Sequence, residues 1–398
     1  MGKEKRKPRR HVRARHRLSF FLLRFVGFVM GLMYGCRYRI FRSRRGQNYF
    51  ILSNHQTLLD PAFVAMSFRA PVYFVAGETL FNDSIPSRLL RYLFAPIKKM
   101  KGTVDVACIR AMVRVAKEGG NVAIFPEGNR TWADVPFYID PAICRLIRLL
   151  KLPLLLYRFE GGYGVDPRWG KSRRRGRFVC GVNKELSVEE IAALSDEELY
   201  RTVLDALTAS DAEGGYLYRS AARAEYLERL LFVCPKCGSI STLRSEGEKV
   251  ICTKCKLSVV YGEDLHLSST DPDFHFSVLK EWYAYQLSAV REMKVVPEEA
   301  IFRDDGAVLY DKTGEKRITV AEGTCVLKNQ ALSVADTEIS LESIRSVSVV
   351  GGRKLVFHTD DRFYILTGDA RFNAIKYALV FNILPTGIKE EKYYGLHL

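Results

Sequence analysis

The sequence predicts an α/β domain with an apolar helix before it, followed by a helical and cysteine-rich segment and a C-terminal β-rich module. Three observations support this fold class. Between about residues 36 and 185, short apolar runs typical of buried strands alternate with stretches of helical periodicity. Two Cys-x-x-Cys pairs lie within residues 234–255. From about residue 296 the apolar period changes to two, with glycine-containing turns between short runs.

The chain has 398 residues, which is long enough for two or three domains. The changes in pattern divide it into a basic arm with an apolar helix, an α/β domain, a helical connector, a cysteine-rich ribbon with a helix, and the β-rich module. In that order, we expect these segments at residues 1–35, 36–185, 186–233, 234–295 and 296–398. The last segment resembles a pleckstrin-homology-like (PH-like) barrel, because one C-terminal helix follows many short strands.

Positive charge is concentrated in two places, although the net charge of the whole chain is +16. Residues 1–17 contain nine lysines and arginines against one glutamate, and residues 171–177 contain five more positive charges. A localised excess of this kind favours contact with an anionic surface over general solubility. That surface could be nucleic acid or anionic lipid. The apolar segment beside the arm favours lipid, so we expect membrane phospholipids as partners and no nucleic acid.

The apolar segment covers residues 18–35 and carries a single charge, Arg24. A spanning helix needs about 20 apolar residues, so the segment is borderline in length. Arginines lie on both sides of it, and the positive-inside rule therefore gives no preferred direction. We favour a helix in the membrane plane, which makes the protein peripheral or monotopic on the cytoplasmic face of the cell membrane. A single spanning helix and a buried core helix are the alternatives, whereas a signal peptide would need a small-residue cleavage site.

Individual elements follow from periodicity and from capping signals. Ser187 and Ser195 each precede a glutamate by three residues, the pattern of a capping box that opens a helix. In the α/β domain we expect strands at 48–53, 72–75, 122–125, 152–159 and 177–182, and helices at 61–69, 86–94 and 108–118. Further helices are expected at 216–231, 274–293 and 370–384.

His55 is the first candidate catalytic residue, because it is the only histidine between positions 17 and 265. Imidazole is the side chain suited to proton transfer near neutral pH, and a carboxylate at Asp60 could orient it. In one regular helix the two side chains would lie roughly 140° apart and could not meet. We therefore expect Asp60 to be the N-cap of a helix that begins at Pro61, with His55 in the loop before it.

A second group of candidates follows the strand predicted at 122–125, where α/β sheets place their sites. The sequence FPEGNRT at 125–131 offers a carboxylate, a flexible glycine and a guanidinium. Glu127 could accept hydrogen bonds from substrate hydroxyls, and Arg130 could make a forked contact with a phosphate.

Together, NHQTLLD at 54–60 and FPEGNRT at 125–131 resemble the first and third motifs of the lysophosphatidic acid acyltransferase (1-acyl-sn-glycerol-3-phosphate acyltransferase, glycerolipid acyltransferase) family. The resemblance extends to bacterial members with a zinc-ribbon extension. It implies acyl transfer from acyl-CoA or acyl carrier protein to the hydroxyl of lysophosphatidic acid, giving phosphatidic acid. It also implies that His55 is the general base, Asp60 its partner, and Glu127, Gly128 and Arg130 acceptor-binding residues.

The sequence departs from the family pattern at two points. Asn129 stands where threonine is frequent, and the arginine of the second motif has no counterpart in IKKMKGTVD at 97–105. Lys99 or Lys101 could supply the positive charge there, as a point charge instead of a fork. The sequence therefore defines the acyl acceptor less well than it defines the acyl-transfer reaction. Another lysolipid or glycerol phosphate, or a non-catalytic zinc-ribbon protein that binds nucleic acid or acts as a scaffold, are the alternatives.

The cysteine pairs predict a structural zinc site. Cys234 and Cys237 are followed, after fourteen residues, by Cys252 and Cys255. Four thiolates at this spacing close a tetrahedral site and leave no position for a reactive water. The other five cysteines are scattered singly, which is typical of a reducing compartment.

Overall fold

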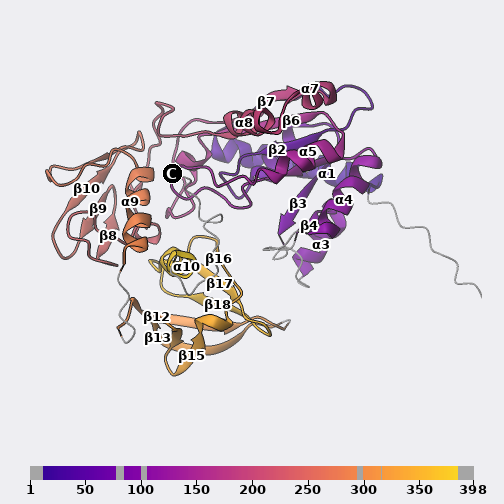
Figure 1. Cartoon of the computed structure of the whole chain (residues 1–398). Helices are drawn as coiled ribbons and strands as arrows, with labels where there is room; N and C mark the ends of the chain where they lie inside the picture. Colours follow the sequence, from indigo (N-terminus) through magenta and orange to yellow (C-terminus); the bar gives the residue numbers. More distant parts are fainter. Residues whose placement is uncertain (1–11, 78–84, 100–104, 294–298, 315, 384–398) are drawn as a thin grey trace, which may run out of the picture. The chain divides into compact units, whose positions relative to one another are not determined.

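The computed structural model describes residues 12–77, 85–99, 105–293, 299–314 and 316–383. The chain forms two compact units whose segments alternate along the sequence. The first consists of Met1–Asn129, Ile139–Glu160 and Phe178–Ala209, and the second of Arg130–Tyr138, Gly161–Arg177 and Ser210–Leu398. Figure 1 shows the chain with labels on many of the helices and strands.

The first unit contains a seven-stranded sheet of order β1-β7-β6-β2-β5-β3-β4. Its strands are β1 (Cys36–Tyr38), β2 (Phe50–Ser53), β3 (Val72–Gly77), β4 (Ile97–Lys99), β5 (Asn121–Ile124), β6 (Leu154–Glu160) and β7 (Phe178–Leu186). The run from β6 to β4 is parallel, whereas β7 pairs with β6 in the antiparallel direction. The two central strands β2 and β5 are buried at every position, as expected for parallel strands covered on both faces.

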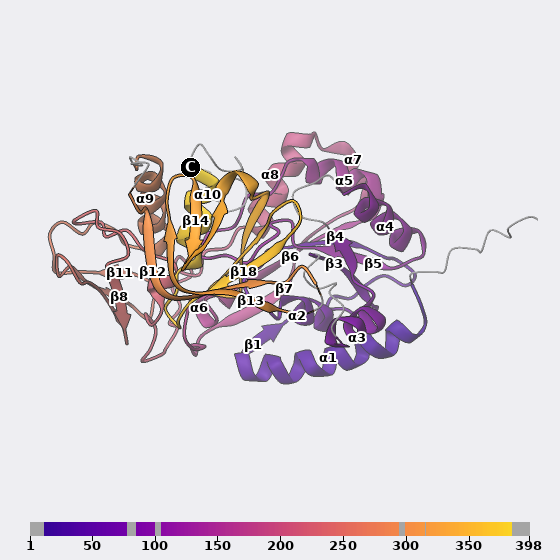
Figure 2. The same cartoon turned by 90° about the horizontal axis from the view of Figure 1, so that it is seen from below.

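Helices cover both faces of this sheet, as Figure 2 shows. On one side lie α1 (Arg15–Tyr34), α2 (Asp60–Ser67) and α3 (Ile85–Phe94). On the other side lie α4 (Val106–Lys117), α5 (Ala142–Leu150), α7 (Val188–Ala193) and α8 (Asp196–Leu207). The unit is therefore a three-layer α/β/α sandwich, and the α/β fold class predicted from the sequence is confirmed.

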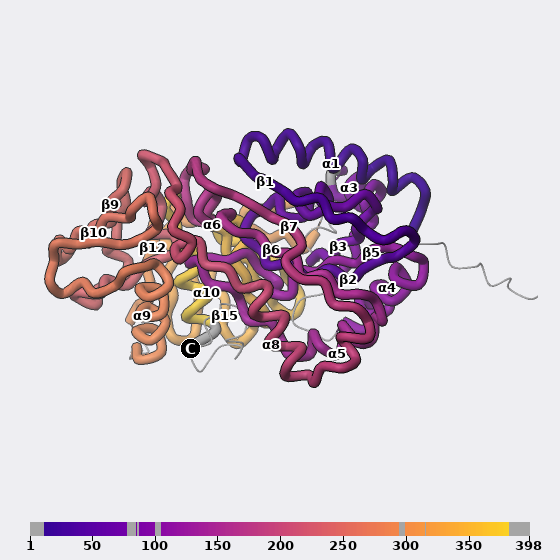
Figure 3. The backbone as a smooth tube through the Cα atoms, turned by 90° about the horizontal axis from the view of Figure 1, so that it is seen from above, coloured from indigo at the N-terminus to yellow at the C-terminus, as the bar shows by residue number. Residues whose placement is uncertain are grey.

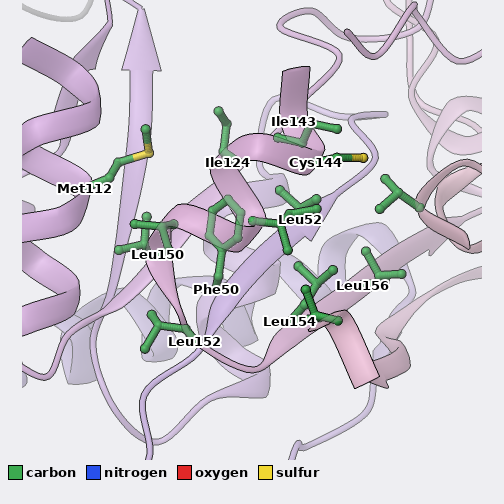
Figure 4. Packing of buried hydrophobic residues seen from close by; sticks show 14 of the residues in the cluster. Phe50, Leu52, Met112, Ile124, Ile143, Cys144, Leu150, Leu152, Leu154 and Leu156 are labelled. Atoms are coloured by element: carbon green, nitrogen blue, oxygen red, sulfur yellow. The ribbon is translucent and has the colours of Figure 1, made fainter. Parts of the chain in front are cut away.

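Alternation along the strands divides the core between the two faces. Leu52 of β2 and Leu154 of β6 belong to the cluster on the α4–α5 side, together with Met112 and Ile143 (Figure 4). On the opposite face, the Tyr157 hydroxyl lies 2.8 Å from the Ser67 hydroxyl at the end of α2. Both helix layers are thus held by side chains of the same strands.

Helix α1 packs against the first unit along its whole length. Figures 2 and 3 show it alongside α3. Near its N-terminus, His16 Nδ1 lies 2.9 Å from the Tyr73 hydroxyl, and near its C-terminus, Tyr34 packs edge-on against Phe63. Among the described residues, α1 is the one helix long and apolar enough to cross a membrane.

Between these ends, glycines let α1 approach α2 closely. A Cβ atom at Gly27 would lie 2.7 Å from Met66 Sδ and 3.1 Å from the carbonyl oxygen of Ala62. Only the absence of a side chain permits this spacing. The expected helix is therefore confirmed, and its inner face is specialised for contact with α2.

The second unit contains two antiparallel sheets. The four-stranded sheet has the order β11-β10-β9-β8 and is formed by β8 (Leu243–Glu246), β9 (Lys249–Cys252), β10 (Ser258–Tyr261) and β11 (Leu267–Ser268). The seven-stranded sheet has the order β15-β14-β13-β12-β18-β17-β16 and is formed by β12 (Phe302–Asp311), β13 (Ile318–Leu327), β14 (Ala331–Val334), β15 (Thr337–Ser340), β16 (Ser346–Val350), β17 (Lys354–His358) and β18 (Phe363–Thr367). Helices α6 (Gly162–Val165), α9 (Leu279–Arg291) and α10 (Ala374–Ile383) belong to the same unit.

Most predicted elements are confirmed, including both capping boxes at Ser187 and Ser195. Strands β1 and β4 and helix α5 of the first unit had not been predicted, nor had the four strands of the smaller sheet in the second unit. The helix expected at 216–231 is wrong, because this stretch contains only a short 3-10 turn, η2 (Leu227–Arg229). Tertiary packing explains the difference. The ring of Tyr218 contacts Gly164 and Gly176, whose lack of a side chain leaves room for it, and Tyr226 adopts a left-handed backbone with φ of 73°.

Replacing Gly27 by leucine should separate α1 from α2. We expect Gly27→Leu to lower the free energy of unfolding by about 1–3 kcal/mol, the usual cost of overpacking. Val29→Leu, at a position that is 41% exposed on the same helix, is the matched control and should be nearly neutral. Thermal unfolding of the two variants would measure the difference, and equal midpoints would contradict the close helix contact.

Candidate active site

The candidate site lies at the carboxyl edge of the parallel strands. Strand β2 ends at Ser53 and leads into His55, and the neighbouring strand β5 ends at Ile124 and leads into Glu127. Because paired parallel strands end at the same edge, the NHQTLLD and FPEGNRT segments of the chain meet there. The contact is direct, since the backbone N–H of His55 donates to Glu127 Oε1 over 3.0 Å.

His55 and Asp60 form a close side-chain pair. The distance from His55 Nδ1 to Asp60 Oδ2 is 2.8 Å, and the Asp60 side chain is fully buried while that of His55 is 20% exposed. An ionised carboxylate only accepts hydrogen bonds, so Nδ1 is the donor. In the neutral imidazole this leaves the lone pair on Nε2, the atom that can accept a proton.

Asp60 also receives hydrogen bonds from the loop that precedes it. The backbone N–H of Gln56 donates to Oδ2 over 2.7 Å, and the Thr57 hydroxyl donates to Oδ1 over 2.5 Å. The backbone N–H of Thr57 lies 3.0–3.1 Å from the two carboxylate oxygens. These donors satisfy the buried charge and hold the loop in the shape that presents His55.

The expected capping role of Asp60 needs a correction. Helix α2 begins at Asp60 itself, and Leu59 occupies the N-cap position without a side-chain hydrogen bond. The carboxylate of Asp60 turns back to the loop amides and does not cap the helix that follows. The physical reason is that buried loop amides need acceptors as much as helix amides do, and they lie nearer to the carboxylate.

One face of the imidazole lies against an aromatic ring. The His55 ring stacks on Phe125, with 4.3 Å between the ring centroids, and Phe125 in turn stacks on Phe74. Glu127 is only 6% exposed, so its hydrogen bond to His55 is shielded from water. The FPEG segment thus positions His55 through both a ring contact and a backbone contact.

Asn54 is a site residue that sequence reasoning missed. Its side-chain amide donates to the carbonyl oxygen of Phe159 over 2.9 Å, and its side-chain oxygen accepts from the N–H of Phe159 over 2.8 Å. These two bonds replace a backbone pair and extend the contact between β2 and β6 beyond Ser53. The sequence feature that could have indicated this role is an asparagine directly after a buried strand. At that position a side-chain amide can bond both the N–H and the C=O of a residue in the neighbouring strand.

The remaining predicted residues occupy different positions. Gly128 has a left-handed backbone with φ of 68°, which explains the glycine in the turn after β5. Arg130 begins the second unit, two residues further along the chain. Lys99 is exposed at the carboxyl end of β4, two strands from β5 and hence about 10 Å away across the sheet. Lys101 lies outside the described residues.

The four predicted metal ligands come together in the second unit. The Sγ atoms of Cys234, Cys237, Cys252 and Cys255 all lie within 4.8 Å of one another. Two of the sulfur pairs are separated by 3.6 and 3.8 Å. A tetrahedral zinc ion with Zn–S bonds of about 2.3 Å requires sulfur–sulfur distances of about 3.8 Å. The donor set therefore fits the geometry of a structural zinc site.

Comparison with known families identifies the class of the first unit. Residues 38–155 match the family model described as Acyltransferase, a range that includes both motifs. This segment of the chain is therefore similar to the acyltransferase family, and the predicted enzyme class, an acyltransferase, is confirmed.

Among solved structures, one similar chain is the 1-acyl-sn-glycerophosphate (LPA) acyltransferase PlsC from Thermotoga maritima. The two share 19% sequence identity with a TM-score of 0.41, over 50% of this chain and 81% of that one. No curated protein matches the sequence.

Replacing Asp60 by asparagine should lower the free energy of unfolding, because it disturbs the hydrogen bonds that hold the loop before α2. The new amide NH₂ would face at least one of the present donors, and each buried donor left without an acceptor costs about 1–3 kcal/mol. Asp205→Asn, at an exposed position of α8, is the matched control. Urea unfolding of both variants would measure the loss, and equal stability would contradict the network described for Asp60.

Proposed function

We propose that the chain is a membrane-associated O-acyltransferase. It transfers a fatty acyl chain from acyl-CoA or acyl carrier protein to the hydroxyl of lysophosphatidic acid, and phosphatidic acid is the product. The observation that carries the proposal is the pairing of His55 with a fully buried Asp60 inside a segment matched by the acyltransferase family.

In the proposed mechanism, Nε2 of His55 removes the proton from the acceptor hydroxyl as its oxygen attacks the thioester carbonyl. Asp60 keeps the imidazole in the required tautomer and stabilises the imidazolium that forms. The tetrahedral intermediate then collapses, the C–S bond breaks, and the leaving thiolate takes the proton from the imidazolium. The acyl group moves directly to the acceptor, so the cycle needs no acyl-enzyme intermediate.

Residues beside His55 divide between positioning and acceptor binding. We propose that Glu127 acts mainly as a positioning residue, because one of its carboxylate oxygens already accepts from the His55 backbone. Gly128 shapes the turn that carries Arg130, whose guanidinium would bind the acceptor phosphate in a forked contact. Lys99 at the end of β4, and Lys101 two residues further along the chain, would add positive charge for the acceptor phosphate. The same chemistry on another lysolipid or on glycerol phosphate is the alternative, and it would use the same base.

The packing of α1 supports attachment in the membrane plane. Its inner face contacts the first unit from His16 to Tyr34, which favours a helix that stays on the domain surface over one that spans a bilayer. Its outer face exposes nine large apolar side chains: Leu18, Phe21, Leu22, Phe25, Val26, Phe28, Val29, Leu32 and Met33. We propose that this face enters the headgroup region on the cytoplasmic side.

The basic segment at 171–177 would contribute less to membrane binding than its positive charge suggests, because several of its side chains are engaged within the protein. Arg174 is buried and donates to the carbonyl oxygen of Arg223, Lys171 forms an ion pair with Glu225, and Arg177 contacts the Tyr216 hydroxyl. Much of the positive charge therefore serves the second unit itself.

We propose a structural zinc ion at the four cysteines and a PH-like fold for the C-terminal module. Zinc would be held by the four thiolates and would join the two knuckles of the ribbon, with no part in acyl transfer. The PH-like assignment is supported by seven antiparallel strands in which the first, β12, pairs with the last, β18, and by the following helix α10. The five-segment division of the chain stays a prediction.

Removing the base should abolish most of the activity. We expect His55→Ala to lower acyl transfer by about 10²–10⁴-fold, the usual contribution of a general base. His266→Ala, at a half-exposed histidine of the second unit, is the control and should leave the rate unchanged. Transfer of a labelled acyl chain from both donor types to a panel of lysolipids and glycerol phosphate would measure the rate and identify the acceptor. Wild-type activity in folded His55→Ala protein would overturn the assignment.

Zinc content provides an independent check of the cysteine site. Elemental analysis should find one zinc per chain, and Cys234→Ser should lose it because three thiolates bind zinc far more weakly than four. Cys108→Ser, in the first unit, should keep the metal. Full zinc content in the Cys234→Ser variant would contradict the site.

A further inference from the structure

Helix α3 carries an apolar stripe that stays more than half exposed in the described part of the chain. Ile85, Leu89 and Tyr92 are 77%, 55% and 56% exposed. Their spacing of four and then three residues places them on one face of the helix. Three large apolar side chains on one short helix form a patch that usually marks an interaction surface.

This stripe adjoins the outer face of α1. Phe94 of α3 packs edge-on against Phe20 of α1, with 5.7 Å between the ring centroids. At the other contact, the Arg15 guanidinium lies 3.9 Å from the centre of the Tyr92 ring. The two helices belong to the same unit and lie on the same side of the sheet (Figure 2). Their exposed apolar side chains therefore form a single two-helix surface.

The charge around this surface identifies the kind of partner. Residues 12–45 and 85–99 contain no aspartate or glutamate, whereas arginines are frequent in both stretches. Arg88 is exposed on α3, next in sequence to Leu89. An apolar stripe flanked by arginines in the described stretches 12–45 and 85–99, with Asp83 as the nearest acidic residue in sequence, matches the boundary between acyl chains and anionic headgroups. A second copy of the chain fits poorly, because two such surfaces would bring like charges face to face.

We infer that α3 is a second membrane-contacting helix, which inserts Ile85, Leu89 and Tyr92 into an anionic bilayer beside α1. The inference rests on the membrane attachment proposed for α1 and adds a second point of contact. A single in-plane helix leaves the domain free to roll about the helix axis. A second helix beside the first removes that freedom and sets the orientation of the first unit relative to the bilayer.

Depth-sensitive fluorescence tests this placement directly. The chain has three tryptophans, Trp132, Trp169 and Trp282, all buried in the second unit, and they set the background signal. In the full-length Leu89→Trp variant the new indole should be quenched by vesicles of phosphatidylcholine and phosphatidylglycerol with brominated acyl chains. Leu149→Trp is the matched control, because Leu149 is 53% exposed on α5 on the opposite side of the sheet, and its indole should be unaffected.

Vesicle sedimentation of charge variants provides the second measurement. Leu89→Glu should weaken binding to the same anionic vesicles about tenfold, because it replaces an inserted apolar side chain by a repelled carboxylate. Leu149→Glu introduces the same charge at matched exposure and should bind as the unmodified protein does.

The possible outcomes separate this inference from the proposed function. If the unmodified protein binds vesicles but the indoles of L89W and L149W are quenched equally little, α1 alone forms the contact and the inference is overturned. If L89E instead dissociates a dimer found without lipid, the surface is an interface between copies and the inference is likewise overturned. If the unmodified protein binds no vesicles, the membrane attachment proposed for α1 fails as well.

Discussion

The carboxylate of Asp60 is fully buried, and a buried charge is tolerated only when hydrogen-bond donors surround it. In this structure the donors are the N–H of Gln56, the N–H and hydroxyl of Thr57, and the imidazole of His55. All of them lie within the five residues before Asp60, so satisfying the charge also determines the path of this loop. The orientation of the imidazole is therefore a consequence of how the protein accommodates one negative charge.

The parallel sheet supplies the second constraint, because it brings distant parts of the chain to the same edge. Glu127 is 72 residues from His55 in sequence, yet its carboxylate accepts from the His55 backbone and Phe125 stacks on the ring. Asn54 joins the same loop to β6 on the other side. The loop that carries His55 is thus held by three neighbouring strands, and each contact restricts a different part of the loop. Such preorganisation is what the proposed proton transfer would require.

Helix α1 relates this site to the proposed membrane surface. Glycine at position 27 allows α1 to pack against α2, the helix that begins at Asp60, while the outer face of α1 stays apolar and exposed. The helix that would enter the bilayer therefore contacts the helix that follows the loop with His55. This arrangement would hold the loop at a constant distance from the membrane, where the proposed lysolipid acceptor would lie.

The sequence by itself determined the features that depend on local pattern. Short stretches of neighbouring residues are enough to recognise the buried strands, the capping boxes, the paired cysteines and the two acyltransferase motifs. The tertiary structure decided where hydrogen-bond partners come from distant segments. It turned Asp60 away from the helix cap, gave Glu127 a positioning contact with His55 and prevented a helix at 216–231, where Tyr218 packs against glycines. It also showed which apolar residues of α3 stay exposed. Periodicity marks a face as apolar, but only packing decides whether the protein covers it.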